Sequence, residues 1–125
     1  MTFQEIKETA LTQTNNDIED LDEFLPHLDD YVNEGYDLLT GAYAAKHVGT
    51  EAYPRLVDDE DVPKLPEWTH PAIANWATWL LYRNGNPQKQ QRGLYFKAAF
   101  DDALSRVYLE GGEKGKRTRF INVYP

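Results

Sequence analysis

The segment that decides the fold class is THPAIANWATWLLYRNG, residues 69–85. Thr69 before Pro71 is typical of a helix start, because proline is tolerated in the first turn of a helix. Trp76 and Trp79 point to different faces of that helix, so we expect it to be surrounded by other elements. Asn84 and Gly85 then predict a left-handed stop. The segment therefore predicts a central, buried helix.

A long helix is expected on either side of this segment. The first begins at Pro26 and fades near His47, since its apolar residues recur every three or four positions and form one buried stripe. The second begins at Asn86 and Pro87 and ends at Gly111-Gly112. We expect its inward face to consist of Leu94, Tyr95, Ala98, Ala99, Ala103, Leu104, Val107 and Tyr108.

The N-terminal region predicts two short helices. Thr2 and Glu5 have the spacing of a capping box, which predicts a helix from about residue 3 to residue 11. Asp17 is a candidate cap for a second short turn through Ile18 and Phe24.

Together these elements predict an all-α fold: a small helical bundle of two long antiparallel helices, a central apolar helix and short N-terminal helices. The domain spans residues 1–112, and residues 113–125 form a basic, extended C-terminal tail. Alternating residues over 119–124 are typical of a single strand. A strand without a partner in its own chain must lie in a groove, pair with another copy or stay disordered.

Composition excludes several classes of protein. The chain has no cysteine, which removes disulfides, thiol catalysis and Cys-ligated metals. No basic-then-apolar leader or bilayer-spanning apolar segment is found, so neither secretion nor membrane insertion is expected.

Charge is divided unevenly along the chain. Residues 1–67 carry 17 acids against four cations, a net charge of −13, and residues 68–125 carry a net charge of +5. The two halves can neutralise each other within one fold. They can also present opposite signs on opposite faces, which suits head-to-tail contact between identical subunits.

Residues with catalytic or metal-binding chemistry are sparse. His27 with Asp30 is the one histidine–acid pair at a ligand spacing, and a surface histidine beside an acid is the commoner explanation. The acidic segment 58–61 lacks the glycine and the distal glutamate of an EF-hand. No phosphate-binding loop or nucleophile elbow is found. We therefore expect no cofactor, no metal and no enzymatic activity.

A resemblance to a known family rests on three stretches. They are LDDYVNEGY (residues 28–36), HPAIA followed by LLYRNGN (residues 70–74 and 80–86), and YFKAAFDDAL (residues 95–104), with Tyr53-Pro54 and Leu65-Pro66 in the loop between the first two. Their layout resembles the small all-α head–tail connector proteins, also called neck or adaptor proteins, of tailed bacteriophages and prophages. The resemblance covers most of residues 1–110 and includes no catalytic signature.

The resemblance implies a structural protein of the virion, assembled in the cytoplasm of the bacterial host. Such proteins form a homo-oligomeric ring beneath the portal, contact the next neck or tail protein, and let DNA pass without sequence-specific binding. An acidic surface suits such a channel because it offers few cations to phosphates. We expect two contact segments, an acidic loop and the tail, and name as protein-interface residues Asp58, Asp59, Glu60, Asp61, Lys114, Lys116, Arg117, Arg119, Phe120, Ile121 and Tyr124.

A second hypothesis is an acidic, protein-binding inhibitor that mimics DNA. It requires carboxylates spaced along one ridge at phosphate-like intervals. Here the acids concentrate in residues 17–37 and 58–61, and the basic tail would repel a DNA-binding cleft.

Overall fold

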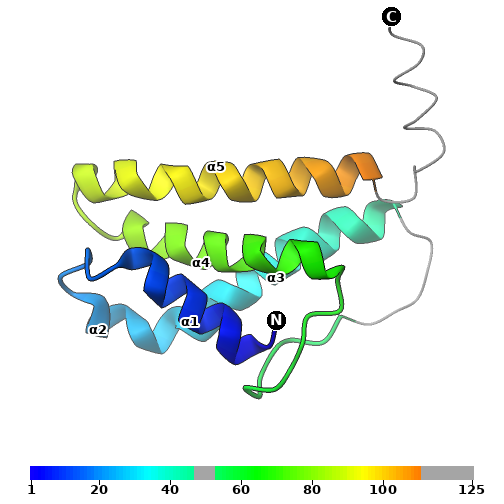
Figure 1. Cartoon of the computed structure of the whole chain (residues 1–125), viewed down its shortest axis with the longest axis horizontal. Coiled ribbons are helices and arrows are strands. Elements are labelled where there is room, and N and C mark those ends of the chain that lie inside the picture. The colour runs from blue at the N-terminus through cyan, green and yellow to red at the C-terminus, as the bar shows by residue number, and fades with distance from the viewer. Residues whose placement is uncertain (47–52, 111–125) are drawn as a thin grey trace, which may run out of the picture.

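The computed structural model describes residues 1–46 and 53–110, and every regular element in these ranges is a helix (Figure 1). This confirms the all-α fold class. The tail and its expected strand lie outside the described residues. The α-helices are α1 (Phe3–Thr14), α2 (Leu21–Phe24), α3 (Leu28–Lys46), α4 (His70–Arg83) and α5 (Pro87–Glu110), and two 3₁₀ turns, η1 (Leu25–His27) and η2 (Glu67–Thr69), precede α3 and α4.

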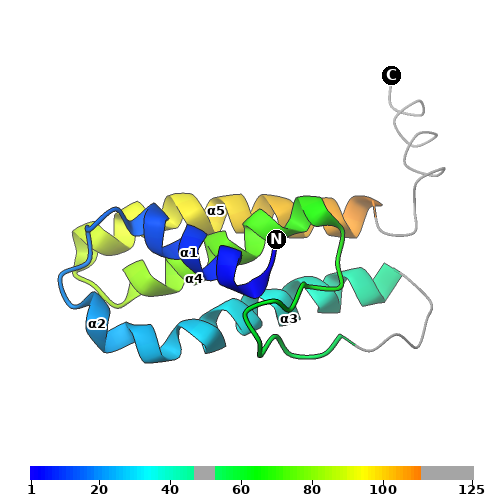
Figure 2. The ribbon, with the colours of Figure 1, turned by 60° about the horizontal axis from the view of Figure 1, so that its bottom comes forward.

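Helix α4 is the centre of the bundle. It contacts α1, α3 and α5, with α5 along one side and α3 along the opposite side (Figure 2). Its faces are buried almost all round, and Ile73, Ala77, Leu80 and Leu81 are fully enclosed. The expectation of a surrounded central helix is therefore confirmed.

The relative direction of the two long helices differs from the expectation. Both α3 and α5 run antiparallel to α4, so they run parallel to each other (Figures 1 and 2). The reason is topological: α4 reverses the chain once after α3, and the short turn after α4 reverses it again.

Two glycines set the distance between helices. A Cβ atom at Gly35 of α3 would lie 2.9 Å from the Cβ of Trp76, and one at Gly93 of α5 would lie 2.5 Å from the Cβ of Tyr82. Both distances are below normal carbon–carbon contact, so only glycine lets α3 and α5 approach α4 this closely.

The inward face of α5 is narrower than the sequence predicts. Its buried side chains are Phe100 and Val107, with the Phe100 ring centroid 4.8 Å from that of Trp76. Leu94, Tyr95, Ala98 and Tyr108 were expected to face inward, but all four are exposed. Helices α3 and α4 cover one stripe of α5, and residues one position further round lie outside it.

Helix ends also depart from expectation in three places. Helix α3 begins at Leu28, because Pro26 belongs to η1. The Thr69 hydroxyl does not cap α4; it donates to the Pro66 carbonyl at 2.6 Å. Asn84 ends α4 in a right-handed conformation. The left-handed residues lie instead at Asn15 and Asn16, after α1.

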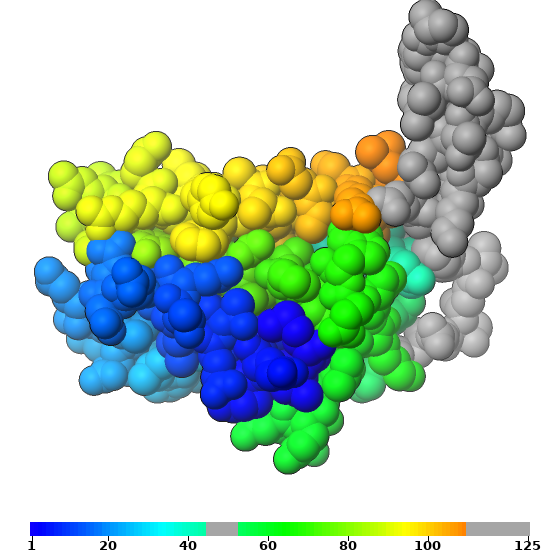
Figure 3. Space-filling model, viewed as in Figure 1, coloured from blue at the N-terminus to red at the C-terminus, as the bar shows by residue number. Residues whose placement is uncertain are grey.

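The capping box at the start of α1 is confirmed. The Glu5 N–H donates to the Thr2 hydroxyl at 3.1 Å, and the Thr2 N–H donates to the Glu5 carboxylate at 2.8 Å. In the space-filling view, the start of α1 lies directly against the segment between α3 and α4 (Figure 3). Among the described residues, no helix has the length and apolar character to cross a membrane.

Candidate functional site

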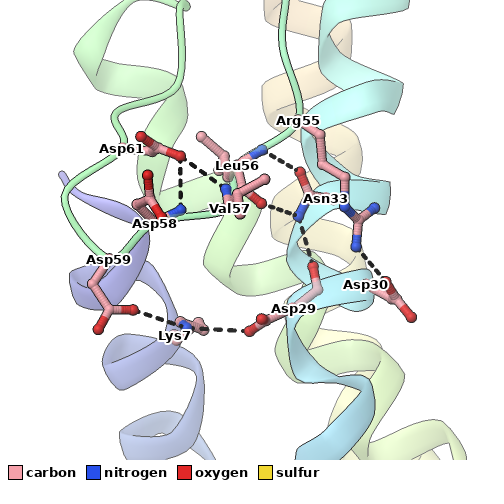
Figure 4. Close-up of polar contacts among 10 residues, drawn as sticks. All are labelled: Lys7, Asp29, Asp30, Asn33, Arg55, Leu56, Val57, Asp58, Asp59 and Asp61. Atoms are coloured by element: carbon pink, nitrogen blue, oxygen red, sulfur yellow. Dashed lines mark hydrogen bonds and ion pairs between the residues drawn. The ribbon is translucent and has the colours of Figure 1, made fainter.

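The expected acidic contact loop belongs to an irregular segment, residues 53–66, that is attached to α3 by Asn33. The Asn33 side chain is 1% exposed and pairs with both backbone groups of Leu56 (Figure 4). Its Oδ1 accepts from the Leu56 N–H at 2.8 Å, and its Nδ2 donates to the Leu56 carbonyl at 3.1 Å and to the Asp29 carbonyl at 2.9 Å. The buried Asn33 amide thus supplies the hydrogen bonds that a neighbouring strand would otherwise make with the backbone of Leu56.

Two further buried side chains hold the end of the same segment. The Tyr36 hydroxyl accepts from the Lys64 N–H at 3.0 Å, and the His70 Nε2 lies 3.0 Å from the Leu65 carbonyl. Burial raises the pKa of Tyr36 despite this hydrogen bond. The three anchors come from α3 and α4, so the loop has one defined position on the bundle.

The acidic turn 58–61 is held together by its own aspartate. The Asp61 carboxylate accepts from the N–H groups of Val57 and Asp58, both at 2.8 Å (Figure 4). These two donors lower the pKa of Asp61 below its ordinary value. Asp61 therefore shapes the turn, whereas the side chains of Asp58, Asp59 and Glu60 are exposed to solvent.

This turn also caps helix α1. The N–H of Phe3 donates to the Asp61 carbonyl at 2.7 Å, and the N–H of Gln4 donates to the Asp59 carbonyl at 3.1 Å. The first turn of a helix leaves such N–H groups without intrahelical partners, and here the loop supplies the acceptors. The sequence-predicted contact loop thus also has a structural role, which the sequence analysis missed.

Lys7 links the acidic turn to α3. Its ammonium lies 3.2 Å from the Asp29 carboxylate and 3.3 Å from the Asp59 carboxylate (Figure 4). Burial lowers the pKa of Lys7, but its hydrogen bonds to the two aspartates outweigh this effect, and the pKa is raised overall. Beside it, Arg55 pairs with Asp30.

Asp17 forms a second polar cluster, at the other end of the bundle. It was predicted to cap α2, but it makes no cap there. Its carboxylate instead accepts from Arg92, from Lys89 at 2.5 Å and from the Tyr82 hydroxyl at 3.0 Å. The hydrogen bonds from Lys89 and Arg92 hold the pKa of Asp17 far below its usual range. Burial and the bond to Asp17 raise the pKa of Tyr82 to about 12.

These pairs decide where charge remains. Lys89 and Arg92 of the basic half pair with Asp17 of the acidic half, so part of the division of charge is neutralised within the fold. Lys7 and Arg55 pair with aspartates of their own half. Helices α2 and α3 lie on the opposite side of α4 from α5 (Figure 2). They carry a row of exposed carboxylates, of which Asp29 is paired with Lys7 and Asp30 with Arg55. We call it the acidic edge and define it by Asp22, Glu23, Asp29, Asp30, Glu34 and Asp37.

The remaining predicted interface residues, Lys114, Lys116, Arg117, Arg119, Phe120, Ile121 and Tyr124, lie outside the described residues. Within residues 1–46 and 53–110, no group of three or more histidines and acids is placed to hold a metal ion. A pocket of about 250 Å³ lies between the link after α1 and the turn after α4, lined by Ile18, Phe24 and Tyr82 among others. Its Tyr82 hydroxyl is already bonded to Asp17.

The comparisons with known proteins found no match: no family model, no curated protein and no solved structure is similar to this chain.

Proposed function

We propose that the chain is a structural protein of tailed bacteriophage or prophage virions, a head–tail connector. In this proposal, copies of the chain form a ring that joins the portal to the neck or tail and lets DNA pass through. Assembly takes place in the cytoplasm of the bacterial host, and the ring becomes part of the virion. The resemblance of residues 28–36, 70–74, 80–86 and 95–104 to this family is the starting point.

The observation that carries the proposal is the acidic edge. Lys7 and Arg55 pair with two of its six carboxylates, Asp29 and Asp30, yet all six remain exposed to solvent on α2 and α3. A surface with one sign of charge on one side suits a heterologous contact with a cationic surface of the next subunit. The tail supplies such cations in Lys114, Lys116, Arg117 and Arg119.

The anchored loop supports the same conclusion. A docking surface needs a defined backbone, since ordering a mobile loop on binding weakens the contact. Asn33, Tyr36 and His70 hold the segment that presents Asp58, Asp59 and Glu60. We propose this turn as a second contact with a neighbouring protein.

The test is the native mass of the full chain across protein concentration, at low and high salt. A connector is expected to form a closed ring that loosens as salt screens its charged contacts. Asp37→Lys, within the acidic edge, should weaken this assembly. Glu8→Lys is the matched control, because Glu8 is equally a mid-helix exposed acid but lies on α1.

Two outcomes would count against the connector. If Glu8→Lys weakens assembly as much as Asp37→Lys, net charge matters and the acidic edge does not. If the chain is no larger than a dimer in all conditions and does not assemble on portal rings, the DNA-mimic hypothesis becomes the better one. Its own test is inhibition of a DNA-binding enzyme that is lost when Asp29, Asp30, Glu34 and Asp37 are changed to lysine.

A further inference from the structure

Helix α5 contains a segment that matches its own reverse. Residues 94–109 read LYFKAAFDDALSRVYL, with the centre between Asp101 and Asp102. From the ends inward, Leu94-Tyr95 is mirrored by Tyr108-Leu109. Closer to the centre, Lys97 is mirrored by Arg106 and Ala98 by Ser105.

The mirrored residues lie on the outer face of the helix. At about 100° per residue, positions 94, 95, 98, 101, 102, 105, 108 and 109 fall within an arc of about 140°. All eight side chains are exposed, whereas Gly93, Phe100 and Val107 on the inner face are buried. We call these eight residues the α5 outer face.

This face concentrates exposed apolar surface. Of the eight large hydrophobic side chains exposed among the described residues, four belong to it: Leu94 at 43%, Tyr95 at 74%, Tyr108 at 48% and Leu109 at 63%. The Tyr95 ring is held edge-on against Phe96, with centroids 5.2 Å apart. Large apolar side chains gathered on one exposed face are typical of an interaction surface.

In a two-fold contact between antiparallel helices centred between Asp101 and Asp102, each residue meets its mirrored position in the second copy. The mirrored sequence therefore places exposed apolar side chains opposite apolar side chains. We propose that two copies of this chain pair through the α5 outer face, with their α5 helices antiparallel. Leu94 then lies opposite Leu109 of the second copy, and Ala98 lies opposite Ser105. The small side chains in the middle allow the helix axes to approach to about 8 Å.

The charges fit the same arrangement. Lys97 pairs with Asp101 at 2.9 Å, and Asp102 stands four residues before Arg106. In the end-for-end pair, the aspartates of the two copies lie on the flanks of the contact, next to solvent. Lys97 offsets the repulsion between the aspartates on one flank, and Arg106 offsets it on the other flank.

The expected pair is weak and concentration-dependent. The mirrored segment is 16 residues, about 24 Å of helix. A contact of this length buries less surface than the roughly 1,600 Å² of a standard interface. The pairing is independent of the proposed ring, because an isologous contact closes at two copies. It also responds differently to salt: screening loosens a charge-matched ring, whereas apolar burial persists in high salt.

The first experiment uses the absence of cysteine in the full chain. In Ala98→Cys/Ser105→Cys, oxidation should link two copies, because the thiol at position 98 of one copy faces the thiol at position 105 of the other. Either single variant should stay unlinked, since its thiols would be about 10 Å apart in that register. Equal linking of the single variants would overturn the antiparallel register. Failure of the double variant to link at concentrations where the native chain sediments as a dimer would also overturn it.

The second experiment measures the dimer directly by sedimentation at high salt. Leu109→Glu should raise the dissociation constant by about tenfold or more, since a side chain that is buried in the dimer becomes charged. Leu38→Glu is the control, because Leu38 is an exposed leucine on α3, outside the α5 outer face. Circular dichroism should show unchanged helix content in both variants. A native chain that is monomeric up to millimolar concentration, or a larger effect of Leu38→Glu, would overturn the proposal.

Discussion

At the scale of single residues, the segment between α3 and α4 depends on Asn33. This amide is the hydrogen-bond partner of both backbone groups of Leu56. A buried backbone group that loses its partner costs about 1–3 kcal/mol.

We therefore predict that Asn33→Leu lowers the free energy of unfolding by about 2–4 kcal/mol, since two buried groups are left unpaired. Chemical denaturation at neutral pH measures this. Gln88→Leu, an exposed polar-to-apolar change on α5, is the control and should stay within about 0.5 kcal/mol. Equal effects of the two variants would show that the Asn33 amide does not hold the loop.

Asp17 makes stability depend on pH. Its pKa in the folded state is lowered far below the ordinary value of 3.8 by Lys89 and Arg92. A lowered folded-state pKa means that the stabilisation is complete above about pH 3.8 and is lost as the pH falls below that value. Asp17→Asn should therefore lower the melting temperature at pH 7, and the difference from the native chain should shrink on acidification.

The control for this prediction is Asp20→Asn, three residues further along. Asp20 is exposed and makes no side-chain cap bond, so its variant should follow the pH profile of the native chain. A difference between Asp17→Asn and the native chain that stays constant down to pH 2 would contradict the role of the Asp17 charge.

At the scale of elements, the packing of α3 and α5 on α4 depends on Gly35 and Gly93. Gly93→Ala places a methyl group 2.5 Å from the Cβ of Tyr82, an atom that is fixed to the α4 backbone. We predict that this variant loses about 1–3 kcal/mol of stability, and that Gly35→Ala is also destabilised. Thermal melts followed by circular dichroism measure both.

Gly41 provides the matched control, because it lies on the same helix as Gly35 and a Cβ there meets nothing within 4 Å. Gly41→Ala should stabilise the chain by about 0.5–1 kcal/mol, as alanine is the better helix former. If Gly35→Ala and Gly93→Ala also stabilised the chain, helix propensity would dominate and close packing would not.

At the scale of the whole molecule, the described residues of the bundle form a hydrophobic core of their own. This core combines side chains of α1, α3, α4, α5 and the anchored loop. We predict that deletion of residues 113–125 leaves the helix content nearly unchanged.

The same deletion should impair ring assembly or docking to the portal, because it removes the four tail cations proposed to meet the acidic edge. Circular dichroism and native mass measured on one sample separate the two effects. An unfolded truncated chain would place the tail in the core of its own subunit. Normal completion of infectious particles would remove its assembly role.

The pattern of residues alone was sufficient for the all-α class, the capping box at Thr2 and Glu5, and the position of the central helix. These features depend on contacts between residues close in sequence and on apolar periodicity, and both can be read from the sequence. The start of α5 at Pro87 could be predicted for the same reason, since proline is favoured in the first turn of a helix.

The tertiary structure alone decided which face of α5 is covered, where Asp17 binds and how the long loop is held. Leu94 and Phe100 are both apolar, and only the places of α3 and α4 determine which one is buried. Asp17 meets Lys89 and Arg92 across more than 70 residues, and Asn33 meets Leu56 across 23. Such contacts form between atoms that folding brings together, so no local pattern in the sequence records them.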